Sequence, residues 1–257
     1  MVKGAIIDLD GTIYRGDILL PFASEFVHNL RKNGIKILFL TNNSQRTVSF
    51  YKRKLNKMGI EVKDSEILTS ARSTARYIKT HYSDPVVYPL GEDGLISELL
   101  KNNIEITYDH RIATVLAVGY DTHLTYEKLK KASLLLQNGG IFIACNPDKS
   151  LPSEEGNIPG NGAQLAFLKE ATGREPYIIG KPHMPIMAEA LNILNTSASK
   201  TIIIGDRYET DVLAGFRAGL MTALVLTGAT QKSDIQNRKK PDFVVENLKE
   251  LWNLLSK

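Results

Sequence analysis

The chain has 257 residues, of which 43% are hydrophobic and 23% are charged, and its formal net charge is +4. This composition is ordinary for a globular protein, and the length allows one large core or two modest ones. Basic residues are scattered among similar numbers of acidic ones, so no nucleic-acid surface is indicated. The single cysteine, Cys145, excludes a disulfide within the chain, and no secretory signal or membrane-spanning segment is readable. We therefore expect a cytoplasmic protein that binds neither nucleic acid nor membrane.

The first eighty residues show a strand, helix, strand pattern. An apolar strand is predicted over 4–10, an amphipathic helix over 21–33 and a second apolar strand over 35–41. Both strands are nearly continuous apolar runs, which is typical of parallel sheets covered by helices on both faces. A helix over 47–59, a short strand over 66–70 and a helix over 71–81 follow.

The pattern then restarts twice. Strands are predicted over 85–91, 113–120 and 141–146, with helices over 94–103, 126–138 and 163–173. A last set has strands within 177–182, 201–206 and 222–228, and helices over 185–194, 211–219 and 247–255. The polar residues of this last set match those of the first segment and not those of the middle one. We therefore predict an α/β protein with a Rossmann-like parallel-sheet core split in sequence, residues 1–80 and 177–257, and a smaller α/β cap domain inserted at 81–176.

Polar residues occur where four of the predicted strands end. In open parallel sheets ligands bind beyond the carboxyl ends of the strands, so residues far apart in sequence converge on one crevice. The residues expected to converge are Asp8, Asp10, Thr41, Asn42, Asn43, Lys181 and Asp206.

This combination of acids, a hydroxyl and an ammonium indicates phosphoryl chemistry. Carboxylates at close range repel by roughly 4 kcal/mol per pair at about 4 Å, and a hard divalent cation relieves that repulsion. Oxygen ligands without His or Cys favour Mg²⁺ over Zn²⁺. The ammonium and hydroxyl suit a phosphate dianion. One carboxylate can then attack phosphorus to give an aspartyl phosphate, while a second acid protonates the leaving group.

The same residues resemble the motifs of the haloacid dehalogenase-like (HAD) phosphohydrolases. The matching stretches are DLDGT at 8–12, Thr41 in FLTNNS, Lys181 in GKP and GDRYETD at 205–211. The long separation of Thr41 and Lys181 is similar to that of members with a large α/β cap, of the C2 type, inserted after the second motif. YRGD, PGNGA and VLTGAT further resemble the NagD-like or para-nitrophenylphosphatase-like subgroup.

The resemblance implies a Mg²⁺-dependent phosphatase acting on small phosphorylated metabolites, whose cap closes over the core crevice and sets specificity. It also implies roles for the motif residues. Asp8 is expected to be the nucleophile and a metal ligand, Asp10 the acid/base and a ligand through its backbone carbonyl, Asp206 the third ligand and Asp211 its support, while Thr41, Asn42, Asn43 and Lys181 hold the phosphate.

Several alternatives remain open. The same aspartyl phosphate would serve a phosphotransferase or mutase, and a non-catalytic module that binds phosphorylated ligands is a third reading. Gly-Lys-Pro is not a Walker A loop, because Glu175 stands where that loop requires Gly, and no dinucleotide glycine fingerprint is present. The glycine-rich stretch 156–162 is predicted to be a loop of the inserted domain. Neither the substrate nor the presence of a homo-oligomer is fixed by the sequence.

Overall fold

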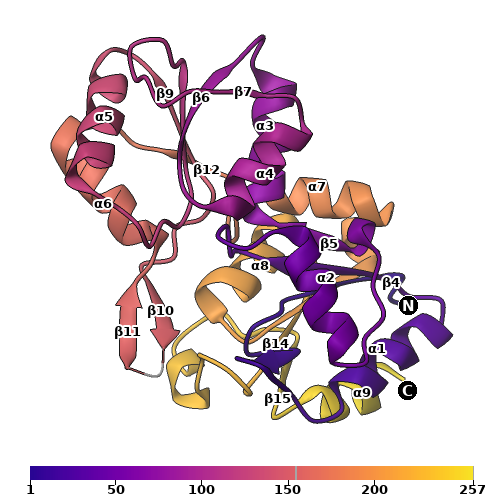
Figure 1. Ribbon diagram of the computed structural model, residues 1–257. Helices are drawn as coiled ribbons and strands as arrows, with labels where there is room; N and C mark the ends of the chain where they lie inside the picture. The colour runs from indigo at the N-terminus through magenta and orange to yellow at the C-terminus, as the bar shows by residue number, and fades with distance from the viewer. Residues whose placement is uncertain (154, 257) are drawn as a thin grey trace. The chain divides into compact units, whose positions relative to one another are not determined.

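The computed structural model describes residues 1–153 and 155–256, and the chain divides into two compact units (Figure 1). The first unit comprises Met1–Thr41, Tyr51–Leu68 and Lys181–Lys257, and the second comprises Asn42–Phe50 and Thr69–Gly180. Among the described residues, no helix is both long enough and apolar enough to cross a membrane.

The first unit is built on a parallel sheet with the strand order β15-β14-β13-β1-β4-β5. β1 pairs in parallel with β13 and β4, β13 with β14, and β14 with β15. The strands are β1 (Gly4–Ile7), β4 (Lys36–Thr41), β5 (Ile67–Thr69), β13 (Thr201–Gly205), β14 (Met221–Val225) and β15 (Phe243–Val245).

Helices cover both faces of this sheet, as the continuous apolar strands predict. On one face α7 (Met184–Leu194) and α8 (Leu213–Ala218) pack against Ile6, Leu38 and Ile203. α1 (Ala23–Lys32) and α9 (Leu248–Leu255) lie together, with Phe26 and Trp252 in edge-to-face contact at 6.4 Å (Figure 1). α2 (Val48–Lys57) follows β4; its first three residues belong to the second unit and the rest to the first.

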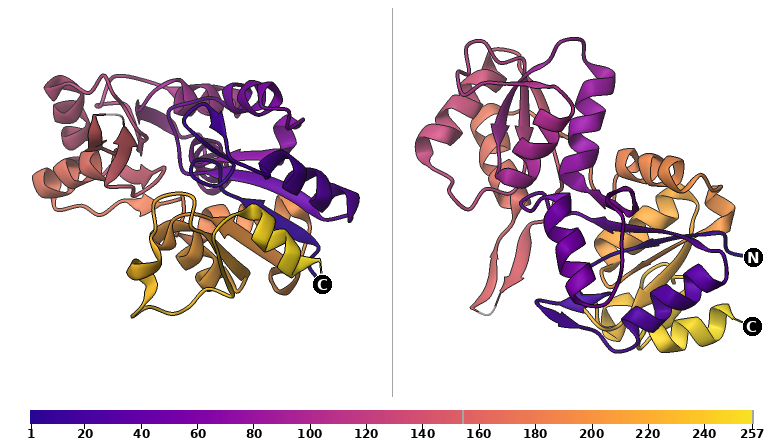
Figure 2. Two further views of the ribbon diagram at one scale, coloured as in Figure 1. Left: turned by 90° about the horizontal axis from the view of Figure 1, so that it is seen from below. Right: turned by 45° about the vertical axis from the view of Figure 1, so that its right-hand side comes forward.

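The second unit repeats the three-layer plan around a parallel sheet ordered β12-β9-β8-β6-β7. Alternate residues of β8 and β9 face opposite helix layers: Leu116 and Phe142 belong to one apolar cluster, and Val115 and Ile143 to the other. The two helix pairs are visible on either side of this sheet in Figure 2. The elements are α3 (Ser70–His81), β6 (Val86–Leu90), α4 (Asp93–Lys101), β7 (Glu105–Ile106), β8 (Val115–Val118), α5 (Tyr126–Gln137), β9 (Ile141–Ala144), α6 (Asn161–Thr172) and β12 (Tyr177–Ile178).

Two short antiparallel hairpins complete the structure. β2 (Tyr14–Arg15) pairs with β3 (Ile18–Leu19), and β10 (Ser150–Ser153) pairs with β11 (Gly156–Pro159). The prediction of a loop over 156–162 was therefore wrong, since its first four residues form β11 and its last two begin α6. β11, with the sequence GNIP, is exposed at every position and lacks the alternation of polar and apolar residues that identifies a strand.

The fold class is confirmed, but one predicted strand belongs to the other sheet. The segment from 177 was expected to resume the first sheet, whereas β12 pairs in parallel with β9, Tyr177 beside Ile143 and Ile178 beside Ala144. A short apolar run does not specify which sheet it joins. The chain returns to the first unit at Lys181.

The packing beneath the first sheet generates a stability prediction. Ile203 is 1% exposed and lies among the apolar side chains of α7 and its neighbouring strands. We expect Ile203→Ala to lower the free energy of unfolding by about 2–5 kcal/mol, because it removes buried methyl groups and leaves a cavity. In the same unit Ile18 is 75% exposed, and Ile18→Ala should change that free energy by less than about 0.5 kcal/mol. Urea unfolding followed by circular dichroism measures both, and similar losses in the two variants would contradict the assignment of Ile203 to the core.

Candidate active site

Asp8, Thr41 and Asp206 lie at the carboxyl ends of three adjacent strands of the first sheet. The parallel register fixes this arrangement, since Ile7 is paired with Phe39 of β4 on one side and with Ile204 of β13 on the other. Asp8 is the first residue after β1, Thr41 is the last of β4 and Asp206 is the first after β13. Sheet register therefore places these three residues at the same edge.

Lys181 forms two ion pairs within this group of residues. Its Nζ lies 2.5 Å from Asp8 Oδ1 and 2.6 Å from Asp211 Oδ1, and 3.4 Å from the carbonyl oxygen of Leu40. The side chain is 2% exposed. A buried ammonium is tolerated only when carboxylates and hydrogen bonds compensate its desolvation, and both are present here.

Burial and mutual repulsion shift the pKa values of these groups. Burial, and after it the charges of Asp211 and Asp206, raises the pKa of Asp8 well above its usual value, although Lys181 opposes that shift. Burial and the charge of Asp211 raise the pKa of Asp206 to about 6. Burial alone would lower the pKa of Lys181, but the Asp211 and Asp8 carboxylates raise it, so this side chain stays charged. The site therefore holds more negative charge than its own ammonium compensates.

The acidic group fits a metal ion. Asp8, Asp206 and Asp211 each offer a carboxylate oxygen, and these oxygens lie within 4.8 Å of one another. A side chain at position 11 would intrude on this group: Gly11 has a φ of +84°, and a Cβ on it would come within 2.5 Å of Asp206 Oδ2. Carboxylate oxygens without His or Cys suit a hard divalent cation. Such an ion would balance the excess negative charge.

The loop within the VLTGAT stretch, to which the sequence analysis assigned no role, holds Asp206. The backbone N–H of Ala229 donates to Asp206 Oδ2 at 2.6 Å, and Thr227 Oγ1 donates to the carbonyl of Gly11 at 2.6 Å. Gly228 between them has no space for a Cβ, because Asp206 occupies it. Apart from the Thr227 hydroxyl, this support depends on a backbone N–H and on the absence of a side chain, so its sequence signal is the VLTGAT stretch after an apolar strand.

Asp10 lies on the turn after β1 and not in the strand. β1 ends at Ile7, and the N–H groups of Thr12 and Ile13 bond back to the carbonyl of Leu9. The two-residue repeat of an extended strand therefore does not determine where Asp10 points. Its side chain is exposed, and partial desolvation by neighbouring atoms raises its pKa, against the nearby charge of Lys54. A raised pKa suits a group that donates and accepts a proton.

Asp211 contacts the backbone as well as the ammonium. Lys181 Nζ is bound to its Oδ1, and the N–H of Arg207 donates to its Oδ2 at 3.1 Å. It lies in a π-helical turn, Tyr208–Val212, that leads into α8. Both carboxylate oxygens are thus engaged, which agrees with a supporting part for Asp211.

Asn42 and Asn43 belong to the second unit. Asn42 Nδ2 donates to Asp148 Oδ2 at 3.1 Å, and Asn43 Oδ1 accepts from the N–H groups of Gln45 and Arg46 at 3.0 and 3.1 Å. Of the predicted site residues, Asp8 and Asp211 contact Lys181, and the carboxylate oxygens of Asp8, Asp206 and Asp211 lie within 4.8 Å of one another. A phosphate-binding role for the two asparagines stays a prediction.

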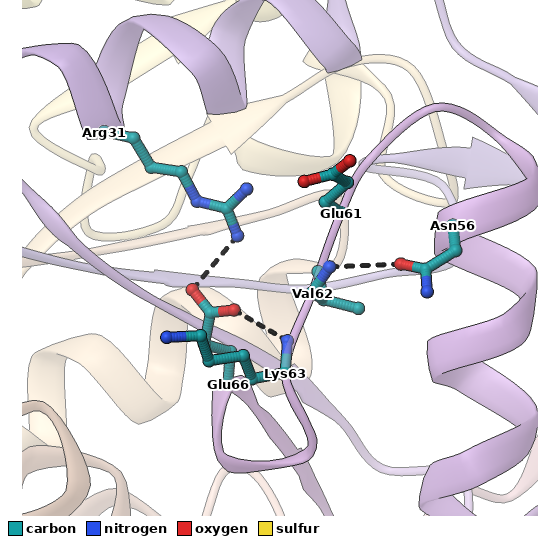
Figure 3. Close-up of a pocket in the computed structure, with 6 residues that line it drawn as sticks. All are labelled: Arg31, Asn56, Glu61, Val62, Lys63 and Glu66. Atoms are coloured by element: carbon teal, nitrogen blue, oxygen red, sulfur yellow. Dashed lines mark hydrogen bonds and ion pairs between the residues drawn. The ribbon is translucent and has the colours of Figure 1, made fainter.

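A hollow elsewhere in the first unit contains none of these residues (Figure 3). In it Arg31 points toward Glu66 and pairs with it at 3.0 Å, and Glu66 also accepts from the N–H of Lys63 at 2.8 Å. Charged groups that pair with each other across a hollow serve local structure. The remaining lining residues are Asn56, Glu61 and Val62.

Comparison with known proteins gives consistent matches over nearly the whole chain. Residues 5–105 match the haloacid dehalogenase-like hydrolase family, and residues 178–251 match a HAD-hydrolase-like family. The chain is 38% identical over 249 residues to the 5'-nucleotidase YutF of Bacillus subtilis, covering 96% of both chains.

Solved structures agree. The p-nitrophenyl phosphatase from Archaeoglobus fulgidus superposes with a TM-score of 0.94 at 38% identity, covering 98% of this chain and 99% of that one. NagD from Escherichia coli K-12 superposes with a TM-score of 0.90 at 32% identity, covering 97% and 98%. The resemblance to the NagD-like and para-nitrophenylphosphatase-like subgroup is thereby confirmed.

The buried ion pairs make the stability of a Lys181→Met variant depend on pH. Methionine fills the space but leaves Asp8 and Asp211 without their counterion, so at about pH 7.5 we expect a loss of roughly 3–5 kcal/mol in the free energy of unfolding. The loss should shrink at about pH 5, because Asp8, whose pKa is raised by burial and is no longer held down by the ammonium, takes up a proton and becomes neutral.

Urea unfolding in metal-free buffer at the two pH values measures this dependence. Lys52→Met is the control, since Lys52 pairs with Asp64 on the surface of the same unit and should contribute little. If Lys181→Met lost the same free energy of unfolding at both pH values, the electrostatic explanation would be contradicted.

Proposed function

The chain belongs to the haloacid dehalogenase-like hydrolases, and we propose that it hydrolyses small phosphomonoesters with the help of Mg²⁺ and through an aspartyl phosphate on Asp8. Its named relatives include a 5'-nucleotidase and a p-nitrophenyl phosphatase, so the chain is a phosphoric monoester hydrolase. The reading as a non-catalytic binding module is set aside on this ground.

One observation carries the proposal: the Asp8 carboxylate is bound by a buried ammonium at the carboxyl edge of the sheet. A carboxylate is a weak nucleophile, and phosphate dianions repel it. Lys181 lowers that repulsion, since its positive charge lies beside the oxygen of Asp8 and is available to the phosphoryl oxygens. The hydroxyl of Thr41, at the end of the adjacent strand, supports the same phosphoryl group in this proposal.

The reaction has two steps with balanced transfers. In the first, an oxygen of Asp8 forms a bond to phosphorus, the bond from phosphorus to the ester oxygen breaks, and Asp10 gives its proton to the departing alkoxide. In the second, Asp10 takes a proton from water as the water oxygen attacks phosphorus. The bond between phosphorus and Asp8 breaks, inorganic phosphate is released and the Asp8 carboxylate is restored.

Asp8 and Asp206, with the backbone carbonyl of Asp10, are the proposed ligands of Mg²⁺. The bound ion would neutralise charge on the phosphoryl oxygens and keep the carboxylates ionised. Asp211 holds Lys181 in place through its Oδ1, and the Gly228 loop holds Asp206.

The substrate itself differs among the named relatives, which act on nucleotides or nitrophenyl phosphate by name. We propose that the second unit selects the leaving group, because the first unit carries the acid group and its ammonium. The names of these relatives favour transfer of the phosphoryl group to water over transfer to another acceptor. If labelled phosphate appeared on an added alcohol or sugar and not as free inorganic phosphate, a transferase would be favoured.

Replacing the nucleophile should abolish turnover. Asp8→Asn keeps the size of the side chain but removes the charged oxygen that attacks phosphorus, so kcat for p-nitrophenyl phosphate should fall by about 10⁴-fold. The control is Asp17→Asn, because the Asp17 side chain is 96% exposed and lies outside the acid group. Release of nitrophenol measures both, and an Asp8→Asn variant that retains wild-type kcat would refute the mechanism.

Mg²⁺ binding should depend on pH. Protons and the metal compete for the same carboxylates, and the pKa of Asp206 is about 6 in the metal-free protein. The rise in unfolding temperature caused by Mg²⁺ should therefore be larger at about pH 7.5, where Asp206 is mostly ionised, than at about pH 5.5, where it is mostly protonated. Differential scanning fluorimetry measures the shift, which Asp206→Asn should remove and Asp17→Asn should retain. Equal shifts at the two pH values would contradict this competition.

A further inference from the structure

Three residues of the segment that follows Thr41 are bonded to other parts of the second unit: Asn42, Ser44 and Gln45. We call residues 42–46 the 42–46 loop. Ser70 Oγ donates to the carbonyl of Asn42 at 2.5 Å, and the N–H of Tyr120 donates to Ser44 Oγ at 2.8 Å. Ser44 is fully buried. Because its polar groups are satisfied inside the second unit, the loop is fixed in the frame of that unit.

Backbone packing fixes the same loop. The N–H of Gly94 donates to the carbonyl of Gln45 at 2.8 Å. A Cβ on Gly94 would lie 2.7 Å from the carbonyl oxygen of Arg46, so the first turn of α4 lies directly against the loop. This approach is possible only for a residue without a side chain.

Glu92 binds the loop through its carboxylate. Gln45 Nε2 donates to both of its carboxylate oxygens, at 3.1 and 3.0 Å, and Thr122 donates to Oε1 through its N–H at 2.7 Å and its hydroxyl at 2.6 Å. These bonds lower the pKa of Glu92 although partial burial would raise it. Glu92 thus joins the 42–46 loop to the segment that follows β8.

Glu92 binds the loop although it lies at the start of a helix. Glu92 is the N-cap residue of α4, where an acidic side chain ordinarily accepts from the free N–H groups of its own helix. It makes no such bond. Its oxygens are directed to Gln45 and Thr122 instead, so the side chain serves the loop and not the helix end.

We infer that Glu92 is a positioning residue for phosphate binding: by holding Gln45 it fixes the 42–46 loop, and with it the backbone that continues directly from Thr41. This inference rests on the proposed function, in which the hydroxyl of Thr41 supports the phosphoryl group, and on the sequence prediction that Asn42 helps to hold it. A loop displaced by a few tenths of an ångström misdirects such donors, since hydrogen bonds weaken steeply with poor geometry.

The test is Glu92→Gln, which keeps the volume but turns one acceptor into a donor facing Gln45 and Thr122. We expect KM for p-nitrophenyl phosphate and the inhibition constant of inorganic phosphate to rise in parallel by about tenfold, while kcat falls by less than about threefold. Gln45→Ala should act in the same direction. The double variant should be no worse than the poorer single one, because both remove the same contact.

Glu127→Gln is the matched control, since Glu127 pairs with Lys130 on the surface of the same unit and should leave every constant unchanged. Lower unfolding temperatures for Glu92→Gln and Gln45→Ala with unchanged KM and phosphate inhibition would overturn the inference, because that pattern belongs to a purely structural role. If Glu92→Gln does not fold, Gln45→Ala decides by the same criterion.

Binding of inorganic phosphate, measured by its stabilisation of the protein without turnover, separates this inference from the proposed function. An active wild type with unchanged phosphate binding in both variants defeats the inference alone. An inactive wild type whose phosphate binding is weakened by Glu92→Gln defeats the proposed function alone.

Discussion

The buried pairing of Lys181 with Asp8 and Asp211 is the constraint on which the first unit depends. The two contacts join residues 173 and 30 positions apart in the chain. An ammonium with 2% exposure is stable only if both carboxylates are in place, and the carboxylates in turn need the ammonium. The chain must therefore return from the second unit at Lys181, directly beside β1 and the turn after β13. The fold and the proposed nucleophile, Asp8, therefore share one electrostatic requirement.

The sequence predicted most of both sheets for a physical reason. Strands buried between two helix layers are continuous apolar runs, and β1, β4, β8, β9, β13 and β14 are all of this kind. The strands it missed, such as β7 (Glu105–Ile106) and β15 (Phe243–Val245), are two or three residues long and partly exposed. β12 was located correctly in the chain but assigned to the wrong sheet, because pairing depends on tertiary contacts that a dipeptide does not encode.

The candidate site divides in the same way. Asp8, Thr41 and Asp206 were identifiable because polar side chains after buried strands are unusual and the carboxyl ends of parallel strands meet. The resemblance included the VLTGAT stretch, but no role was predicted for Gly228 and Ala229, since they act through a backbone N–H and through the absence of a side chain. Glu92 was hidden for another reason: an acid before a helix is expected as a cap, and only the structure shows that its oxygens are used elsewhere.

The place where the second unit joins the first has a chemical consequence. If the inserted unit were connected by linkers without hydrogen bonds to it, changes within that unit would not affect the end of β4. Here Asn42, the residue after Thr41, accepts a hydrogen bond from the Ser70 hydroxyl at its backbone carbonyl. Its side-chain amide donates a second hydrogen bond to Asp148. The carbonyl and the side chain of Asn42 are therefore committed to partners within the second unit, and a change that shifts those partners displaces Asn42 with them. Because the sequence predicts that Asn42 helps to hold the phosphate, we propose that such a change alters phosphate binding as well as the choice of leaving group.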